Sequence, residues 1–289
     1  MPTGDKTPMA DQDLESEYSP RLSIPDHAEI FARWARTAED YRAEMLKAGK
    51  AELGFSYGET SRQFVDLFFP AAGEAAPLAL FIHGGYWRAM DPSFHSHMAR
   101  GLNERGFAVG VVGYDLCPVV TIADIIEQIR RACASLWQRF DRRMLVCGHS
   151  AGGHLTAAMV ATDWQKLWPK VPQDLVPVGY AISGVFDLTP LAKTNMNQDF
   201  KLDDQTAREI SPIFWTVPEG RALDAAVGDL ETSEFKRQSR SMADVWRQRQ
   251  AETRYGELPG NHFTVIDGLA DPKNAMVARI AELARRITP

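Results

Sequence analysis

The sequence predicts an α/β fold with a mostly parallel sheet covered by helices on both faces. Three observations lead to this expectation: continuous apolar runs, helical segments that separate them, and the absence of any stretch resembling an interdomain linker. Apolar runs without polar alternation indicate strands that are buried on both faces, which is typical of parallel sheets. Their alternation with helices indicates βαβ units. We therefore expect one domain over residues 1–289.

The N-terminal part is expected to be a small cap beside this sheet. Its first 15 residues are polar and contain proline, which predicts loose order there. Apolar residues recur at helical spacing over 26–48, and the alternating segment 62–70 suits a strand near a sheet edge. We assign residues 16–60 to an N-terminal helical cap and regard residues 186–220 as a second candidate cap piece.

The central elements follow from the apolar runs and the segments between them. We expect strands at 77–85, 107–114, 142–150, 176–184, 222–229 and 251–256, and helices at 93–104, 121–139, 151–162, 233–250 and 272–287.

Composition excludes several classes of function. The chain has 32 Lys and Arg against 38 Asp and Glu, so its net charge of −6 argues against a nucleic-acid or anionic-membrane binder. Its three cysteines, at 117, 133 and 147, imply neither a disulfide framework nor a zinc signature. No long apolar span or signal-type leader is present, so we expect a cytoplasmic protein. We also expect no metal or cofactor. The sequence leaves a homodimer open.

The strongest motif is GHSAG at 148–152, which reads G-x-S-x-G. It follows a predicted strand and precedes a predicted helix, which is the context that a nucleophile elbow requires. Because the turn is tight, glycines flank it, and the helix N-terminus favours developing negative charge. We therefore predict Ser150 as a nucleophile at the carboxyl end of a central strand.

The segment HGGYW at 83–87 is expected to supply an oxyanion hole. In α/β hydrolases, such a loop contributes a backbone amide together with the amide of the residue after the nucleophile. We predict the amides of Gly85 and Ala151, with Gly84 or Tyr86 as further contributors. We expect His83 to brace the loop rather than bind a metal. Trp87, like Tyr86, is expected either to line the pocket or simply to pack.

A general base must lie late in the chain, because the triad order in this fold is Ser, then acid, then His. His262 alone follows the elbow by more than a helix length, and it sits in a turn. The acid should follow the strand at 222–229. Asp229 and Glu231 both lie there, and residue chemistry alone leaves the choice between them open.

Several segments together resemble the arylformamidase (kynurenine formamidase) branch of the α/β-hydrolase esterases. They span nearly the whole chain from about residue 17: EYSPR (17–21), SYGE (56–59), HGGYW (83–87), YDLCP (114–118), GHSAGGHL (148–155), SGVFDLTPL (183–191) and NHF (261–263). The resemblance implies an α/β-hydrolase fold, a catalytic serine and no metal. It also implies N-formyl-L-kynurenine as substrate, cleaved to kynurenine and formate.

The resemblance also bears on the individual site residues. It supports Ser150 and His262, and it places the acid at Glu231, where the family usually has Asp; Asp229 is the reserve. For the amino-acid end of the substrate, we consider Tyr86 and the asparagines of KTNMNQDF, Asn195 and Asn197. Turn formation is an equally good reason for these asparagines.

Two other functions remain open, because a fold and a triad do not choose a substrate. The first is a carboxylesterase or acetylesterase that acts on small acyl esters or amides with the same residues. The second is a non-catalytic ligand-binding protein on the same fold, for which a broken triad would be expected. If the protein is an enzyme, we expect its small-molecule partner to be an acyl amide or ester substrate.

Overall fold

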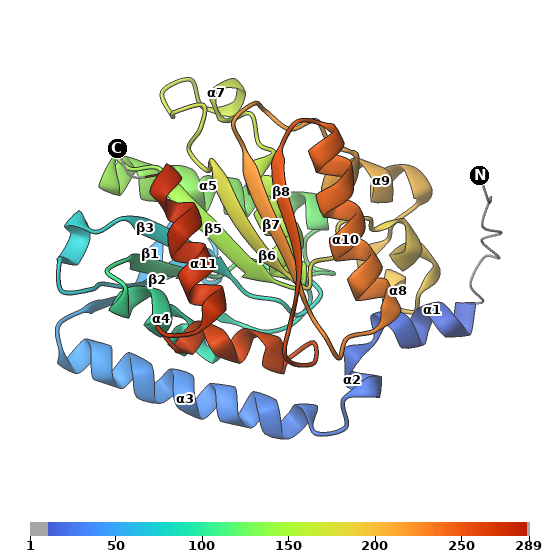
Figure 1. Cartoon of the computed structure of the whole chain (residues 1–289), viewed down its shortest axis with the longest axis horizontal. Coiled ribbons are helices and arrows are strands. Elements are labelled where there is room, and N and C mark those ends of the chain that lie inside the picture. The colour runs from blue at the N-terminus through green and yellow to red at the C-terminus, as the bar shows by residue number, and fades with distance from the viewer. Residues whose placement is uncertain (1–10, 288–289) are drawn as a thin grey trace.

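The computed structural model describes residues 11–287, which form one mixed sheet with helices on both faces (Figure 1). Within these residues, the strand order is β1-β2-β4-β3-β5-β6-β7-β8. The strands are β1 (Ala51–Ser56), β2 (Phe64–Phe68), β3 (Leu78–Ile82), β4 (Ala108–Val112), β5 (Met144–His149), β6 (Val178–Ile182), β7 (Ala222–Gly228) and β8 (Glu252–Leu258).

The strands from β4 across to β8 are parallel, whereas β2 runs antiparallel to both β1 and β4. The predicted mostly parallel sheet is therefore confirmed. β1 was not predicted, because its residues are largely exposed and its pairing with β2 is irregular between Glu52 and Phe55. An edge strand that faces water carries little hydrophobic signal.

The helices alternate with the strands in the predicted order. They are α1 (Asp11–Tyr18), α2 (Pro20–Ser23), α3 (His27–Lys47), α4 (Arg100–Glu104), α5 (Ile122–Phe140), α6 (Ala151–Val160), α7 (Trp164–Leu167), α8 (Asn197–Phe200), α9 (Asp204–Glu209), α10 (Ser233–Gln248) and α11 (Ala275–Leu283).

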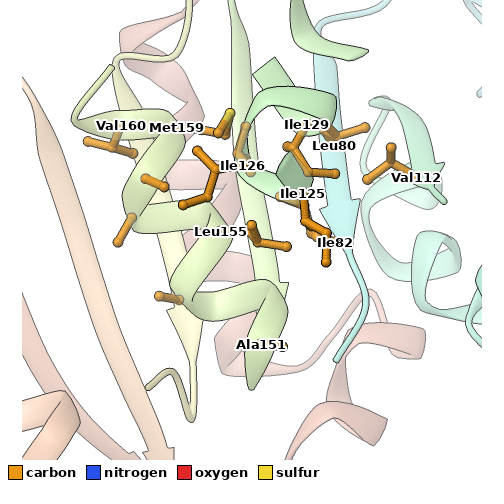
Figure 2. Packing of buried hydrophobic residues seen from close by; sticks show 14 of the residues in the cluster. Leu80, Ile82, Val112, Ile125, Ile126, Ile129, Ala151, Leu155, Met159 and Val160 are labelled. Carbon is orange, nitrogen blue, oxygen red and sulfur yellow. The ribbon is translucent and has the colours of Figure 1, made fainter. Parts of the chain in front are cut away.

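Each central strand contributes side chains to two separate cores, because successive side chains point to opposite faces of a sheet. On one face, Leu80 and Ile82 of β3 pack against α5 and α6, as Figure 2 shows. On the other face, Ala79 and Phe81 pack in a cluster that includes residues of α3, α4 and α11. Burial on both faces explains why these strands read as unbroken apolar runs.

The predicted helix at 93–104 is wrong in its first half. The chain there forms two 3-10 turns, Pro92–Phe94 and Ser96–Ala99, before the short α4 begins. His95 separates the two turns with φ −123° and ψ 3°, which is outside the helical region, and its ring stacks on that of His83 at 5.6 Å. The last predicted helix is also shorter, since α11 ends at Leu283 and a 3-10 turn follows.

Of residues 1–15, for which loose order is expected, residues 11–15 belong to α1, and residues 1–10 lie outside the described part. Long-range hydrogen bonds hold this helix against α10. The Glu17 carboxylate accepts from the Ser233 hydroxyl and the Glu234 amide, both at 2.9 Å. The buried Tyr18 hydroxyl donates to Glu234 at 2.6 Å. We call residues 14–22 the N-terminal strap.

The predicted cap of residues 16–60 is divided between two places. Its beginning, in the strap and at the start of α3, lines the pocket that contains Ser150. Trp34 and Tyr41 place α3 in the core on one face of the sheet, and β1 is the sheet's edge strand. The burial of large aromatic side chains thus makes α3 a structural layer. None of the helices over residues 11–287 has the length and apolar character needed to cross a bilayer.

The core helix α6 carries a histidine that should make folding sensitive to acid. His154 is buried and its Nε2 donates to the Ile210 carbonyl at 2.7 Å. Burial lowers the pKa of His154 to about 4. Between its ordinary value near 6.5 and 4, the unfolded chain binds a proton that the folded chain does not, so stability falls as the pH falls through this window.

We predict that His154→Gln, which keeps a donor for Ile210, flattens this pH dependence. The slope of the free energy of unfolding against pH should fall by about 1.4 kcal/mol per pH unit between pH 4.5 and 6. Urea denaturation at several pH values measures the slope. A variant whose slope equals that of the parent protein would contradict the assignment.

Candidate active site

Ser150 sits on a sharp turn between β5 and α6. Its backbone has φ 56° and ψ −117°, a conformation that costs energy for a residue other than glycine. The glycines on either side of Ser150 are required because neighbouring backbone atoms leave no space for a side chain. A Cβ on Gly148 would lie 2.3 Å from the Gly152 carbonyl oxygen, and one on Gly152 would lie 2.0 Å from the Ile82 carbonyl oxygen. The G-x-S-x-G pattern therefore reflects close packing of α6 against the ends of β3 and β5.

The structure brings Ser150, His262 and Glu231 into one hydrogen-bonded chain. His262 Nε2 lies 3.1 Å from Ser150 Oγ, and His262 Nδ1 lies 2.6 Å from Glu231 Oε2. Their side chains are nearly buried, with 5% of His262 and none of Glu231 exposed. Strand ends supply all three, since the residues follow β5, β8 and β7 respectively. This arrangement has the geometry of a nucleophile, a base and an orienting acid.

Glu231 is held by donors beyond His262. Its Oε1 accepts a hydrogen bond from the Gly228 amide at 2.7 Å and another from the Ser183 hydroxyl. Ser183 follows β6 with φ 53° and is fully buried. The sequence analysis did not single out Ser183, and the one signal that pointed to it was its position near the carboxyl end of the strand predicted at 176–184.

Asp229 is placed differently from Glu231, although only two residues separate them. It is exposed, and its carboxylate accepts from the Gly260 amide at 2.9 Å. Asp229 thus braces the turn that precedes His262, while the longer Glu231 reaches the imidazole itself.

The HGGYW loop lies directly beside the elbow. A Cβ on Gly84 would lie 3.0 Å from the Ser150 Cβ, and one on Gly85 would lie 2.3 Å from the Ala89 carbonyl oxygen. Gly85 has φ 106° and Tyr86 has φ 51°, so the loop is tightly coiled. Ala151 opens α6, where first-turn amides have no partner within the helix. The three residues predicted to form an oxyanion hole, Gly84, Gly85 and Ala151, are therefore gathered around Ser150.

His83 braces this loop, as expected. Its Nδ1 donates to the Gly84 carbonyl at 2.7 Å, and its ring stacks on Tyr114 at 4.4 Å. Burial, aided by neighbouring His95, lowers the pKa of His83 to about 3, so the ring is neutral. Over residues 11–287, His, Cys, Asp and Glu side chains form no cluster suited to a metal ion.

His149, within the elbow, contacts the base directly. Its Nε2 donates to the His262 carbonyl at 2.7 Å, and the two rings lie 4.8 Å apart. Burial, and then the neighbouring His262, hold the pKa of His149 well below its ordinary value. A neutral His149 adds no positive charge beside His262. The Phe235 ring also packs against His262, with 4.3 Å between the ring centres, and the sequence analysis did not predict this contact.

A pocket of about 590 Å³ opens above Ser150. Its walls come from the HGGYW loop, the strap, the start of α3 and the turn carrying His262. Tyr86 lines it and joins two walls, because its hydroxyl donates to the Tyr18 carbonyl at 2.5 Å. A cavity of this size accommodates a small organic ligand.

Three residues predicted to contact substrate lie outside this pocket, which corrects those expectations. Trp87 is fully buried and packs edge-on against His154 and Phe200. The side-chain amide of Asn197 is already hydrogen-bonded to the backbone, because its Nδ2 donates to the Ala192 and Leu202 carbonyls. Asn195 does not line the pocket either. Hydrogen bonds to the backbone of the turn therefore explain Asn197. Met196, between the two asparagines, does line the pocket.

Comparisons with known proteins agree with this geometry. Residues 79–257 match a protein family described as the alpha/beta hydrolase fold. The chain is 28% identical to a kynurenine formamidase of Salmo salar over 91% of this chain and 92% of that protein. It is 26% identical to a kynurenine formamidase of Danio rerio, with the same coverage. The crystal structure of a candidate thioesterase from a Silicibacter species is 35% identical, with a TM-score of 0.84, covering 93% of this chain and 99% of that one.

The chain belongs to the α/β-hydrolase fold family, and the predicted fold class is confirmed. Within that family it is similar to kynurenine formamidases over about nine-tenths of its length.

The close approach of Gly152 to Ile82 yields a test of the elbow. We predict that Gly152→Ala destabilises the protein by more than about 2 kcal/mol, because its Cβ has no space beside the Ile82 carbonyl. Gly256→Ala is the matched control, since a Cβ there meets no atom within 4 Å. Urea denaturation of both variants measures the effect. Equal stability of the two variants would contradict the packing argument.

Proposed function

We propose that this protein is a serine hydrolase that removes the formyl group from an aryl formamide, with N-formyl-L-kynurenine as its substrate. One observation carries the proposal: the hydrogen-bonded chain from Ser150 through His262 to Glu231 beneath a pocket of about 590 Å³. The names of the two fish relatives support the choice of substrate.

In the first step, His262 Nε2 takes the proton of the Ser150 hydroxyl while Oγ attacks the formyl carbon. A C–O bond forms, and the carbonyl electron pair moves to oxygen, giving a tetrahedral oxyanion. Glu231 holds His262 in the correct tautomer and stabilises its positive charge. The Ser183 and Gly228 donors keep Glu231 in the orientation that this role requires.

The oxyanion would be stabilised by the backbone amides of Gly85 and Ala151. Amide donors aimed at a developing charge are effective because they are already oriented before the reaction. Each such donor typically contributes about 3–4 kcal/mol of transition-state stabilisation.

In the second step, the imidazolium of His262 gives its proton to the anilide nitrogen as the C–N bond breaks. This protonation is important because an anilide is a poor leaving group. Kynurenine leaves, and the formyl group remains as an ester on Ser150. Water, deprotonated by His262, then attacks this ester, releasing formate and restoring the serine.

A second candidate function is hydrolysis of small acyl esters or thioesters. The similarity to the candidate thioesterase structure, at 35% identity, supports this second candidate function. The same residues would act, and the leaving group would be an alkoxide or thiolate. Ligand binding without catalysis is the third candidate function. The turnover experiment below distinguishes the three candidate functions.

We expect hydrolysis of N-formyl-L-kynurenine with a kcat/KM well above that of p-nitrophenyl acetate. Ser150→Ala should reduce kcat for both by at least about 10⁴-fold, since the nucleophile is lost. Formation of kynurenine and of p-nitrophenolate, each followed by absorbance, measures the two reactions. Turnover of the ester alone would favour the second function, and no Ser150-dependent turnover of either would favour a binding protein.

The choice of acid is tested by a matched pair of amide variants. Glu231→Gln should reduce kcat by about 10³- to 10⁴-fold, because the amide neither orients nor stabilises the imidazolium in the same way. Asp229→Asn should leave kcat within a few-fold, since its carboxylate accepts from the Gly260 amide, whereas His262 bonds to Glu231. The reverse pattern in steady-state kinetics would show that Asp229 is the acid.

A further inference from the structure

Four charged side chains of opposite signs line the pocket within the described residues. They are Glu15 and Arg21 on the strap, and Arg88 and Asp199 opposite. Arg88 and Asp199 neutralise each other in an ion pair of 2.6 Å. This leaves one acid and one base, both on the strap, facing the same cavity.

Neither strap charge is matched by a counter-charge over residues 11–287. Arg21 forms no ion pair there, and its guanidinium lies 5.5 Å from the centre of the Phe31 ring. Glu15 accepts hydrogen bonds from the Asn195 amide at 2.9 Å and the Ser19 hydroxyl at 3.3 Å, but it pairs with no cation there. Carboxylate and guanidinium groups that border a cavity in this way are suited to binding opposite charges on a ligand.

An aromatic wall connects these charges to the reacting atoms. Phe31, next to Arg21, lies 4.8 Å from Phe263 and 5.5 Å from Trp34, measured between ring centres. The Phe263 ring in turn lies 5.5 Å from the ring of His262. An aryl group packed along this wall would have its acyl nitrogen near His262 and its substituents near the strap.

Resting on the proposed function, we propose that Arg21 and Glu15 form a subsite for the zwitterionic amino-acid tail of the substrate. Arg21 binds the tail carboxylate and Glu15 binds its ammonium group. The pocket thereby selects aryl formamides that carry an α-amino acid over uncharged acyl compounds. This subsite takes the place of the asparagines that sequence reasoning considered for the same purpose.

Three ligands of graded charge test the subsite in the Ser150→Ala protein, where binding is measured without turnover. They are N-formyl-L-kynurenine, its desamino analogue 4-(2-formamidophenyl)-4-oxobutanoate, and the uncharged 2′-formamidoacetophenone. Isothermal titration gives the Kd of each for Ser150→Ala alone and combined with Arg21→Met, Arg21→Lys or Glu15→Gln. Arg36→Met is the matched control, because Arg36 is exposed and lies outside the pocket.

Arg21→Met should weaken both carboxylate ligands about tenfold, the usual effect of losing a charge-assisted hydrogen bond, and leave the uncharged ligand unchanged. Arg21→Lys should recover part of this loss. Glu15→Gln should weaken only the zwitterion. Arg36→Met should change none of the three Kd values.

Equal weakening of all three ligands by Arg21→Met, or weakening of none, would overturn the subsite, as would failure of the zwitterion to bind better than the uncharged ligand. Binding of the uncharged ligand to Arg21→Met serves as the folding control, because this ligand fills the same pocket without using the proposed charges. Because binding is measured apart from turnover, the subsite and the proposed reaction can fail separately. Selective binding without formamide turnover would overturn only the reaction.

Discussion

The active site depends on the close approach of α6 to the end of β3. At this point Gly152 lies so near the Ile82 carbonyl that no side chain fits between them. The contact turns the chain sharply at Ser150 and brings the start of α6 beside Gly84 of the neighbouring loop. Nucleophile, helix N-terminus and glycine loop are therefore assembled by backbone packing, before any substrate arrives. Such prior orientation is what makes amide donors effective in stabilising charge.

Around this contact, successive strand ends supply the remaining polar groups. Ser183 follows β6, Glu231 follows β7 and His262 follows β8, so the parallel sheet places them side by side at one edge. At position 231 this chain has Glu where the family that it resembles usually has Asp, and the geometry explains the difference. The longer glutamate spans from the Gly228 amide to His262, and Asp229 is free to brace the Gly260 turn instead. Residue chemistry alone could not distinguish the two carboxylates, whereas in the structure each has a different partner, His262 for Glu231 and the Gly260 amide for Asp229.

The N-terminal strap forms one wall of the pocket above Ser150. It is anchored to α10 through Glu17 and Tyr18, and to the HGGYW loop through the Tyr86 hydroxyl. The same α10 places Phe235 against the His262 ring. The helix α10 therefore supports both His262 and the strap that carries Arg21 and Glu15. The proposed base and the proposed charge subsite thus depend on the same helix.

The sequence by itself determined the central strands of the sheet, the order of the helices between them, and the positions of Ser150, His262 and the glycine loop. These depend on local signals, namely apolar runs and tight turns that only glycine allows. It did not determine the edge strand β1, the helix α1 or the roles of Ser183, Asn195 and Asn197. Those depend on contacts between distant residues, such as the 216 positions that separate Tyr18 from Glu234. Only the tertiary structure decided them, because no local pattern records which polar group will meet which across the folded chain.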